Sequence, residues 1–270
     1  LGLGFTLAIQ ITTLTASDFA DIYSQITTAS RFFALTGSYL SIIGLLLIAR
    51  ISWIENVLGH DRLVTWHRKA MPYALYFITA HILLVTLGYA GTDQVRIGSE
   101  LWTMITTYPW MLPAALGFVL LLVAGVSSYR IFRQSISYES WWLIHLYTYL
   151  GVALSFMHQI LTGAMFISHP LAKNYWIGLY SLVVIAILYW RILLPFTKSI
   201  RHKLMVEKVV VEGASVVSIY IKGRNIKNLN AQGGQFFSWR FLSKDLWFQS
   251  HPYSLLSLIH ISEPTRHLRI

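Results

Sequence analysis

The sequence predicts an all-α membrane protein: a bundle of six helices, the first of them truncated, followed by the start of an antiparallel β-barrel. With a mean hydropathy of +0.56, 55% hydrophobic residues and 12% charged residues, the chain is too apolar for a soluble domain of this length. Five apolar runs each approach the roughly 20 residues that cross the hydrocarbon core of a bilayer. Beyond Lys203, apolar and polar residues alternate, which is typical of strands.

The apolar runs predict the helices one by one. They span residues 32–50, 67–90, 110–129, 141–163 and 175–196. The apolar stretch Leu1–Leu14 is interpreted as the end of a sixth helix. The chain begins without Met and without a basic signal-peptide region, so we expect it to be a fragment. Cysteine is absent, which excludes disulfides, thiolate-ligated haem and cysteine-bound iron–sulfur clusters.

The distribution of charge predicts the orientation in the membrane. One set of connections and helix ends carries most of the basic residues: Arg50, Arg62, Arg68, Lys69, Arg130, Arg133, Lys198, Arg201 and Lys203. The opposite side has Arg31, Arg96 and Lys173 among Asp18, Asp21, Asp93 and Glu100. By the positive-inside rule the first set is cytoplasmic. The net charge of +10 therefore reflects topology, and its spread over helix ends argues against nucleic-acid binding.

Four histidines lie inside two of the apolar runs. His67 and His81 are 14 residues apart in one run, and His145 and His158 are 13 apart in another. These separations correspond to roughly 20 Å along a helix, which reaches from one side of the membrane towards the other. Both helices are expected to enter from the cytoplasm, so His67 pairs with His145 on the inner side and His81 with His158 on the outer side. Two such facing pairs can hold two b-type haems by bis-imidazole ligation.

The helical phase of the two pairs differs. Fourteen residues nearly complete a whole number of turns, whereas thirteen leave a mismatch of about 140°. The second helix therefore needs a tilt, a π-bulge or a different approach to the haem edge. Single membrane histidines also serve as packing residues or in proton relays of haem-free transporters, but the matched pairs and the lack of carboxylates within the spans favour haem. The histidines outside the spans are expected to be ordinary polar residues: His60, His169, His202, His260 and His267. A metal site at His169 is left open as an alternative.

The two histidine-bearing segments resemble a known family. Leu63–Val85 and Tyr138–Gln159 are similar to the ferric reductase-like transmembrane domain, a family that includes ferric reductases and NADPH oxidases. The resemblance extends over roughly residues 30–257. It implies six transmembrane helices, two stacked haems on the four histidines and a cytoplasmic flavin domain. Arg68 and Lys69 are candidate partners of the haem propionates. The aromatic residues expected around the haems are Trp66, Trp141, Trp142, Tyr147 and Tyr149.

The segment after Lys203 resembles a ferredoxin-reductase-type flavin barrel. Residues 205–211 and 215–222 are predicted strands, and the glycine-led segment 233–241 is similar to a strand of that barrel. His251, Pro252, Tyr253 and Ser254 resemble its flavin-binding motif. The resemblance implies that this motif binds FAD, with Tyr253 packed near the isoalloxazine and Ser254 hydrogen-bonded to it. An ordinary edge strand containing a proline is the alternative interpretation.

We therefore expect three regions. Residues 1–200 form the di-haem domain, 201–258 a partial FAD-binding barrel, and 259–270 a truncated or non-native tail. The nicotinamide-binding domain of the family lies outside this chain, so the chain itself is not expected to bind NAD(P)H. The resemblance implies a flavocytochrome b oxidoreductase of the bacterial plasma membrane. In it, electrons pass from cytoplasmic NAD(P)H through FAD and two b haems to an external acceptor. The lipid bilayer and this acceptor are the expected partners, and the oligomeric state is open.

The acceptor is predicted from one position. Oxidases that make superoxide carry a further histidine one turn after the outer ligand, and Val85 occupies that position here. This favours ferric chelates over dioxygen. The alternative acceptors are a quinone and a periplasmic partner. An alternative function is that of a haem-bearing subunit that passes electrons to a partner enzyme. The flavin motif in the same chain argues against the subunit role.

Overall fold

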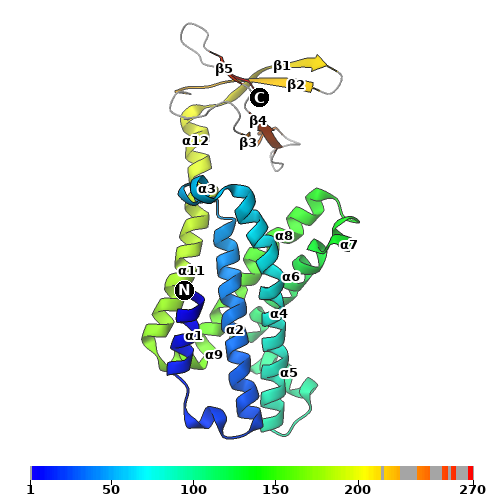
Figure 1. The fold of residues 1–270 in the computed structure, drawn as a ribbon. Helices are drawn as coiled ribbons and strands as arrows, with labels where there is room; N and C mark the ends of the chain where they lie inside the picture. Colours follow the sequence, from blue (N-terminus) through cyan, green and yellow to red (C-terminus); the bar gives the residue numbers. More distant parts are fainter. Residues whose placement is uncertain are drawn as a thin grey trace. The chain divides into compact units, whose positions relative to one another are not determined.

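The structure, a computed structural model, describes residues 2–213, 216–225, 236–243, 251–254, 257–259 and 267–269 (Figure 1). The chain divides into two compact units, Leu1–Trp190 and Arg191–Ile270, which are described separately. Helices make up the first unit, and the second combines a helix with strands. The predicted division into an α-helical part and a β part thus corresponds to this architecture. The barrel itself stays a prediction, because the described strands form two small sheets.

The first unit consists of α-helices with short connecting helices. The long helices are α2 (Ile22–Leu47), α4 (His60–Thr92), α6 (Met111–Ser128), α8 (Tyr138–Leu154) and α11 (Pro170–Ala186). The shorter elements are α1 (Gly2–Thr12), the 3₁₀ helix η1 (Ala16–Phe19), α3 (Ser52–Leu58), α5 (Ile97–Thr107), α7 (Arg130–Arg133), α9 (Phe156–Thr162) and α10 (Ala164–Ser168). A π-helical segment, η2 (Ile187–Leu193), continues α11.

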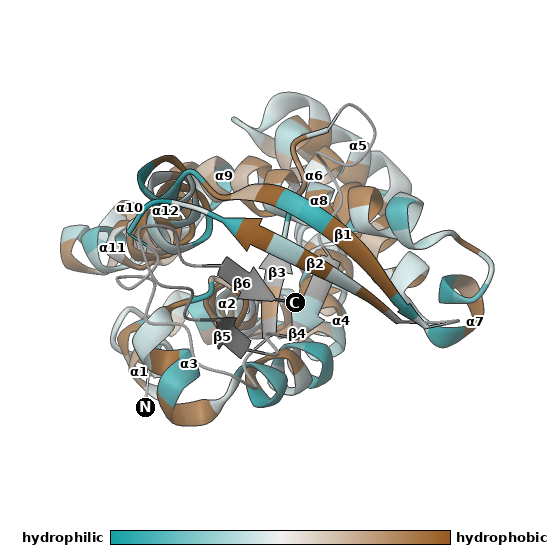
Figure 2. Ribbon diagram, turned by 90° about the horizontal axis from the view of Figure 1, so that it is seen from above, coloured by the Kyte–Doolittle hydropathy of each residue, from teal (hydrophilic) through white to brown (hydrophobic). Residues whose placement is uncertain are grey.

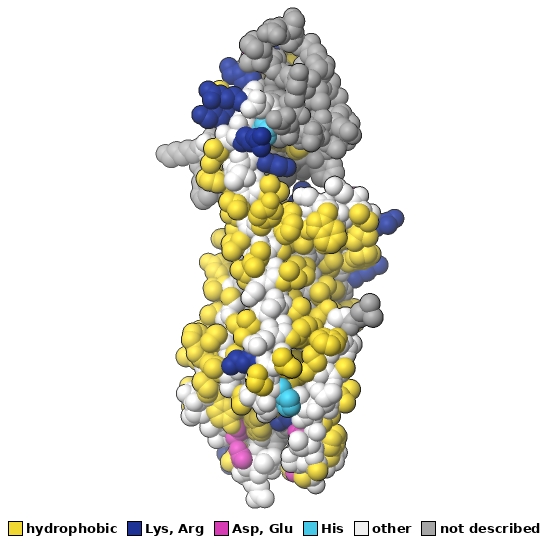
Figure 3. Space-filling model, turned by 90° about the vertical axis from the view of Figure 1, so that its left-hand side faces the viewer, with side chains coloured by type: hydrophobic (Ala, Val, Ile, Leu, Met, Phe, Trp, Pro, Cys, Tyr) yellow, Lys and Arg dark blue, Asp and Glu magenta, His cyan; other side chains and the backbone are white. Residues whose placement is uncertain are grey.

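Four helical stretches are long and apolar enough to cross a membrane. They are Ile22–Leu47, His60–Thr92, Met111–Ser128 and Pro170–His202. Figure 3 shows hydrophobic side chains over the flank of these helices, as expected for a surface in contact with lipid. The protein is therefore an integral membrane protein. The predicted continuous helix 141–163 is wrong in one respect: Ser155 divides it into α8 and α9. The stretch Leu1–Leu14 forms the shorter apolar helix α1.

Polar side chains mark where the helices begin. Asp21 caps α2, accepting hydrogen bonds from the backbone N–H groups of Tyr23 and Ser24 at 2.8 and 3.0 Å. Hydrogen bonds from the Ser24 hydroxyl and these N–H groups hold the pKa of Asp21 below its ordinary value. Ser137 caps α8 in the same way, accepting from the N–H of Ser140 at 3.2 Å. The helix start of α8 is thus specified by a local sequence signal.

Close helix packing in this unit depends on small residues. A Cβ at Gly37 of α2 would lie 3.0 Å from the Ala74 carbonyl oxygen of α4. Gly117 of α6 faces Gly151 of α8, and a Cβ at Gly117 would lie 2.6 Å from the Gly151 carbonyl oxygen. Such contacts let the backbones approach closely, as is common between helices in membranes. The main apolar core joins α2, α8, α9, α10 and α11: Leu35, Ile42, Leu45, Val152, Ile160, Met165, Phe166, Ala172, Trp176 and Val183.

The second unit contains α12 (Leu194–His202) and antiparallel strands. The strands are β1 (Met205–Gly213), β2 (Val216–Lys222), β3 (Phe236–Trp239), β4 (His251–Ser254), β5 (Ser257–Ile259) and β6 (His267–Arg269). One sheet has the order β1-β2-β6-β5, and β3 pairs with β4 in another. Hydrophobic and hydrophilic residues both occur along β1 and β2 (Figure 2). These two strands correspond to the predicted alternating segments. β6, which lies within the expected tail, pairs with β2.

Candidate functional site

The structure brings together two of the four predicted histidines directly. His67 of α4 and His145 of α8 have ring centroids 6.1 Å apart and ring planes at 79°. The pairing arises because α6 packs against both helices and holds them on the same side of the unit (Figure 1). His67 and His145 thus face each other, as the matched depths predicted.

Hydrogen bonds from α2 determine the tautomers of the two histidines on α4. His67 Nδ1 lies 3.0 Å from the Gly44 carbonyl oxygen, and His81 Nδ1 lies 3.1 Å from the Ser30 carbonyl oxygen. A carbonyl oxygen only accepts hydrogen bonds, so each Nδ1 carries the proton. The lone pair of each imidazole is then on Nε2, where it can bind a metal ion. Backbone atoms of the neighbouring helix thus orient both rings with Nε2 as the nitrogen that can bind a metal.

His145 reaches the same tautomer through a side chain. The Ser128 hydroxyl donates its one proton to the Ala124 carbonyl oxygen at 2.7 Å. It must therefore accept from its other neighbours, Trp141 Nε1 at 3.1 Å and His145 Nδ1 at 3.4 Å. The longer distance makes this the weakest of the histidine hydrogen bonds. It nevertheless leaves the lone pair on Nε2 of His145.

His158 follows the break in the fourth predicted span. The break at Ser155 lies between His145 and His158 and interrupts the regular helix; it was not among the adjustments that the 13-residue spacing suggested. The π-helix, one of the predicted ways to make that adjustment, occurs instead in η2. Within the described ranges, Nδ1 of His158 is buried and has no hydrogen-bond partner of acceptable geometry. His158 and His81 are near enough to interact electrostatically.

The short helix α9 is held by hydrogen bonds from Gln159, the residue after His158. Gln159 Oε1 accepts from Trp176 Nε1 at 2.7 Å, and Gln159 Nε2 donates to the Ser155 carbonyl oxygen at 2.9 Å. Trp176 is fully buried, and Tyr180 also contacts the Gln159 amide. Gln159 therefore anchors α9, and with it His158, to α11.

The inner pair fits a metal bound between two imidazoles. With metal–nitrogen bonds of about 2.0 Å to both Nε2 atoms, the ring centroids would lie roughly 6 Å apart. The observed separation of 6.1 Å agrees with this. Within the described part of the chain, no group of three His, Cys, Asp or Glu side chains could hold a metal ion. His169 therefore belongs to no such group there. Two histidines without further protein ligands suit a haem, whose porphyrin supplies the other four nitrogens.

Of the aromatic and basic residues expected around the haems, some lie beside a histidine and others are exposed. Trp141 stacks on His145 with ring centroids 5.1 Å apart and planes at 21°. Trp66 and Tyr147 are exposed on the flank, with 46% and 47% of their surface accessible. Arg68 and Lys69 are exposed as well. Only Trp141 among these aromatics has a ring contact with one of the four histidines in the described part of the structure.

Several residues that position the histidines were not predicted. Ser128 and Gln159 are polar residues in apolar runs, which is a sequence signal that could have identified them. The carbonyl groups of Gly44 and Ser30 carry no such signal, because every residue has a carbonyl. A Cβ at Gly44 would collide with the Met71 side chain, so the glycine allows α2 to lie against α4 at this point.

The two predicted flavin segments pair with each other. In β3 and β4, Phe237 lies opposite Tyr253 and Trp239 opposite His251. Phe241 contacts Tyr253 edge-on, with ring centroids 6.3 Å apart. The glycines at 233 and 234 lie outside the described residues. The strand pairing places an aromatic cluster around Tyr253, and binding of FAD by His251, Pro252, Tyr253 and Ser254 stays a prediction.

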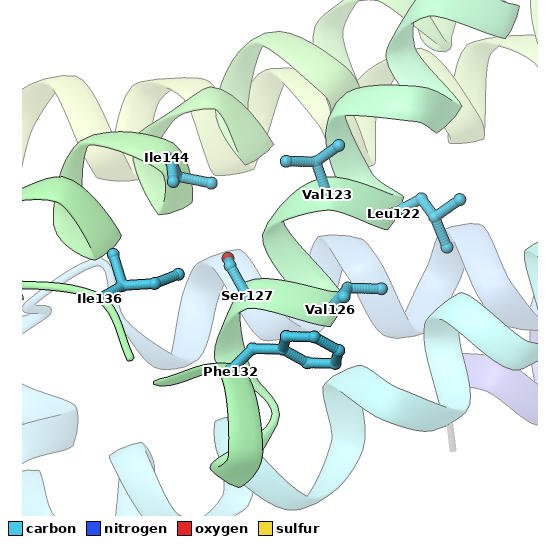
Figure 4. A pocket seen from close by; sticks show the side chains of 7 residues that line it. All are labelled: Leu122, Val123, Val126, Ser127, Phe132, Ile136 and Ile144. Carbon is cyan, nitrogen blue, oxygen red and sulfur yellow. The ribbon is translucent and has the colours of Figure 1, made fainter. Parts of the chain in front are cut away.

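An apolar groove of about 390 Å³ lies between α6, α7 and α8, next to the turn that carries His145 (Figure 4). Its lining residues are Leu122, Val123, Val126, Ser127, Phe132, Ile136 and Ile144. Ser127 donates its hydroxyl proton to the Ala124 carbonyl oxygen at 3.0 Å. The groove therefore suits a hydrocarbon chain better than a polar substrate.

Comparison with known families gives an independent assignment for the helical unit. Residues 33–156 match the model of the ferric reductase like transmembrane component family. This match suggests transmembrane electron transfer by an oxidoreductase. The matched segment contains His67, His81 and His145, and His158 follows two residues after its end. The flavin motif lies outside it. No curated protein matches the chain.

Proposed function

We propose that the protein carries electrons across the membrane through two b-type haems, one held by His67 and His145 and the other by His81 and His158. The facing pair of His67 and His145, 6.1 Å apart within the segment that matches the ferric reductase family, is the observation that carries this proposal. The hydrogen bonds that leave Nε2 of His67, His81 and His145 unprotonated support it.

The chain's own residues orient the ligands and exclude water. The Gly44 and Ser30 carbonyl oxygens accept from the Nδ1–H groups, which fixes the tautomer and the rotation of each ring. His67 and His145 would hold one haem and His81 and His158 the other, so these four side chains would serve as ligands and not as contacts of the acceptor. When bound, each haem would supply a one-electron redox centre within the low dielectric of the membrane.

On the same proposal, electrons enter from cytoplasmic NAD(P)H through FAD and leave to a ferric chelate outside. Support for the flavin comes from the motif at residues 251–254, which pairs with the predicted strand β3. Support for the ferric chelate comes from Val85, which stands where superoxide-producing oxidases have a histidine. The cytoplasmic side is assigned from the basic residues at one set of helix ends.

Haem content tests the central part of the proposal. Detergent-purified protein is expected to contain two b-type haems per chain in a pyridine haemochrome assay. Replacing His81 or His145 with alanine should reduce this number to one or none, because one haem would lose one of the two histidines that hold it. His60→Ala is the matched control: His60 starts the same helix as His81 but contacts Glu55 at 3.0 Å, so both haems should be retained. A colourless protein produced with ample haem would contradict the proposal.

The acceptor is tested separately. Pre-reduced protein mixed with Fe(III)-citrate under anaerobic conditions should be reoxidised several-fold faster than with dioxygen at the same concentration. Stopped-flow absorbance at the haem bands measures both rates. Rapid reoxidation by dioxygen with superoxide as the main product, and negligible reaction with Fe(III)-citrate, would favour the oxidase alternative.

A further inference from the structure

His145 differs from the other histidines in having a stack of side chains on one face. Trp141, one turn earlier on α8, lies parallel to the His145 ring with centroids 5.1 Å apart. On the Trp141 ring, in turn, lies the guanidinium of Arg133, with Cζ 4.8 Å from the ring centroid. We call these three residues the Arg133–Trp141–His145 stack. Neither His67 nor His81 has a cation–aromatic neighbour of this kind in the described structure.

Local structure holds each member of the stack in place. Arg133 ends the short helix α7 and donates from Nη1 to the Ile136 carbonyl oxygen at 3.2 Å, which folds the connection back over α8. Tyr138 also lies under the guanidinium, at 5.8 Å. Trp141 donates from Nε1 to the Ser128 hydroxyl, the same oxygen that accepts from His145 Nδ1. The tryptophan thus contacts the histidine twice, through its ring face and through the shared hydroxyl.

The stack places a permanent positive charge close to the inner histidine pair. The two centroid distances put the guanidinium within roughly 10 Å of the imidazole, about one Debye length at 0.1 M salt. No carboxylate forms an ion pair with Arg133 among the described residues. Arg133 is half-buried, and partly buried charges are screened less by salt than fully exposed ones. The charge of Arg133 therefore acts on whatever redox group His145 binds.

We propose that Arg133 and Trp141 are positioning residues that raise the midpoint potential of the haem held by His67 and His145. This inference rests on the proposed function. Reduction adds one negative charge to the haem, and a nearby guanidinium stabilises the reduced form relative to the oxidised form. The Trp141 ring holds the guanidinium, and its Nε1 shares the Ser128 hydroxyl oxygen with His145 Nδ1. Among the cation–aromatic contacts of the described residues, none involves a ring that stacks on His81 or His158.

The experiment is a spectroelectrochemical titration of the purified protein, with low-temperature EPR of its low-spin haems. Arg133→Gln is expected to retain two haems and to lower the reduced-to-oxidised ratio of one of them at least threefold at fixed potential. That is a shift of about 28 mV, at 59 mV per tenfold change. Arg133→Lys should preserve most of the potential. Arg130→Gln is the matched control, because Arg130 lies on the same short helix but is exposed and has no aromatic ring beneath it in the described structure.

Trp141→Phe provides a second, independent variant. It keeps an aromatic face but removes the N–H that binds Ser128, so the EPR signal of one haem should change while the other stays constant. Unchanged potentials in Arg133→Gln, or an equal shift in Arg130→Gln, would overturn the inference and leave the proposed function intact. If Arg133→Gln does not fold, unchanged spectra and potentials in Trp141→Phe would have the same consequence. Wild-type protein without haem would overturn both.

Discussion

Replacing Gly117 with alanine should destabilise the helical unit by about 1–3 kcal/mol, the usual effect of overpacking a close contact. The added Cβ would lie 2.6 Å from the Gly151 carbonyl oxygen and 2.8 Å from Ser155 Oγ. The first of these atoms belongs to the backbone of α8, so rotation of a side chain cannot relieve the contact. Because α8 carries His145 and Gly151 lies between His145 and Ser155, α6 and α8 must separate where the histidine pairs are built.

We expect the variant to show a lower thermal midpoint in detergent and less bound haem than the wild type. Gly178→Ala is the matched control, since a Cβ at Gly178 of α11 meets nothing within 4 Å. That substitution should be neutral or stabilise the protein by about 0.5–1 kcal/mol, because alanine has less conformational freedom to lose than glycine. Equal thermal midpoints for the two variants would show that the Gly117–Gly151 contact is not important for stability.

Replacing Gln159 with leucine should cost about 1–3 kcal/mol, because it leaves a buried donor without its acceptor. Trp176 is fully buried and donates to Gln159 Oε1 at 2.7 Å. Leucine also removes the bond from Nε2 to the Ser155 carbonyl oxygen, which ties α9 to the break in the span. The variant should unfold at lower temperature, and His158, the adjacent residue, should lose its fixed position.

On the proposed function, Gln159→Leu therefore affects one haem more than the other. The reduced-minus-oxidised spectrum should show loss or broadening of the haem bound by His81 and His158, with the inner haem retained. Asn174→Leu serves as the control, because Asn174 is exposed on α11 and its replacement should change neither stability nor the spectrum. Equal loss of both haems in Gln159→Leu would indicate general unfolding and would argue against a specific role at His158.

Much of the architecture was predictable because lipid imposes a simple rule on sequence. Apolar runs of sufficient length must form helices, and four predicted spans correspond to helical stretches that can cross a membrane. The histidine pairing was predictable too, since the rise per residue relates position in the sequence to depth in the membrane. The rings of His67 and His145 indeed lie close together, with their centroids 6.1 Å apart and their planes nearly perpendicular. The roles of the four histidines as haem ligands and of residues 251–254 in binding flavin stay predictions.

Hydropathy did not predict the break in the helix at Ser155. Hydropathy gives the segment 141–163 one continuous apolar character, so it predicts a single helix. At the break, Ser155 Oγ donates to the Gly151 carbonyl oxygen at 2.8 Å, and Gln159 supplies a further bond from the following turn. The Ser155 N–H donates to the same Gly151 oxygen at 3.2 Å, so the side-chain bonds add to the backbone bond there. The phase mismatch of the 13-residue spacing suggested a tilt, a π-bulge or a different approach to the haem edge, and none of these predicts a break at Ser155.

By itself, the sequence determined that the chain crosses the membrane, which runs become helices, and which four histidines lie at matched depths, because hydropathy and helical rise depend only on the order of residues. Tertiary structure alone decided which atoms hold those histidines. The carbonyl oxygens of Gly44 and Ser30 and the hydroxyl of Ser128 set the tautomers. Arg133 lies on the Trp141 ring, and Trp141 stacks on His145, because of how the chain connects α7 to α8. The physical reason is that hydrogen bonds and ring contacts require a distance between atoms, and only helix packing determines that distance.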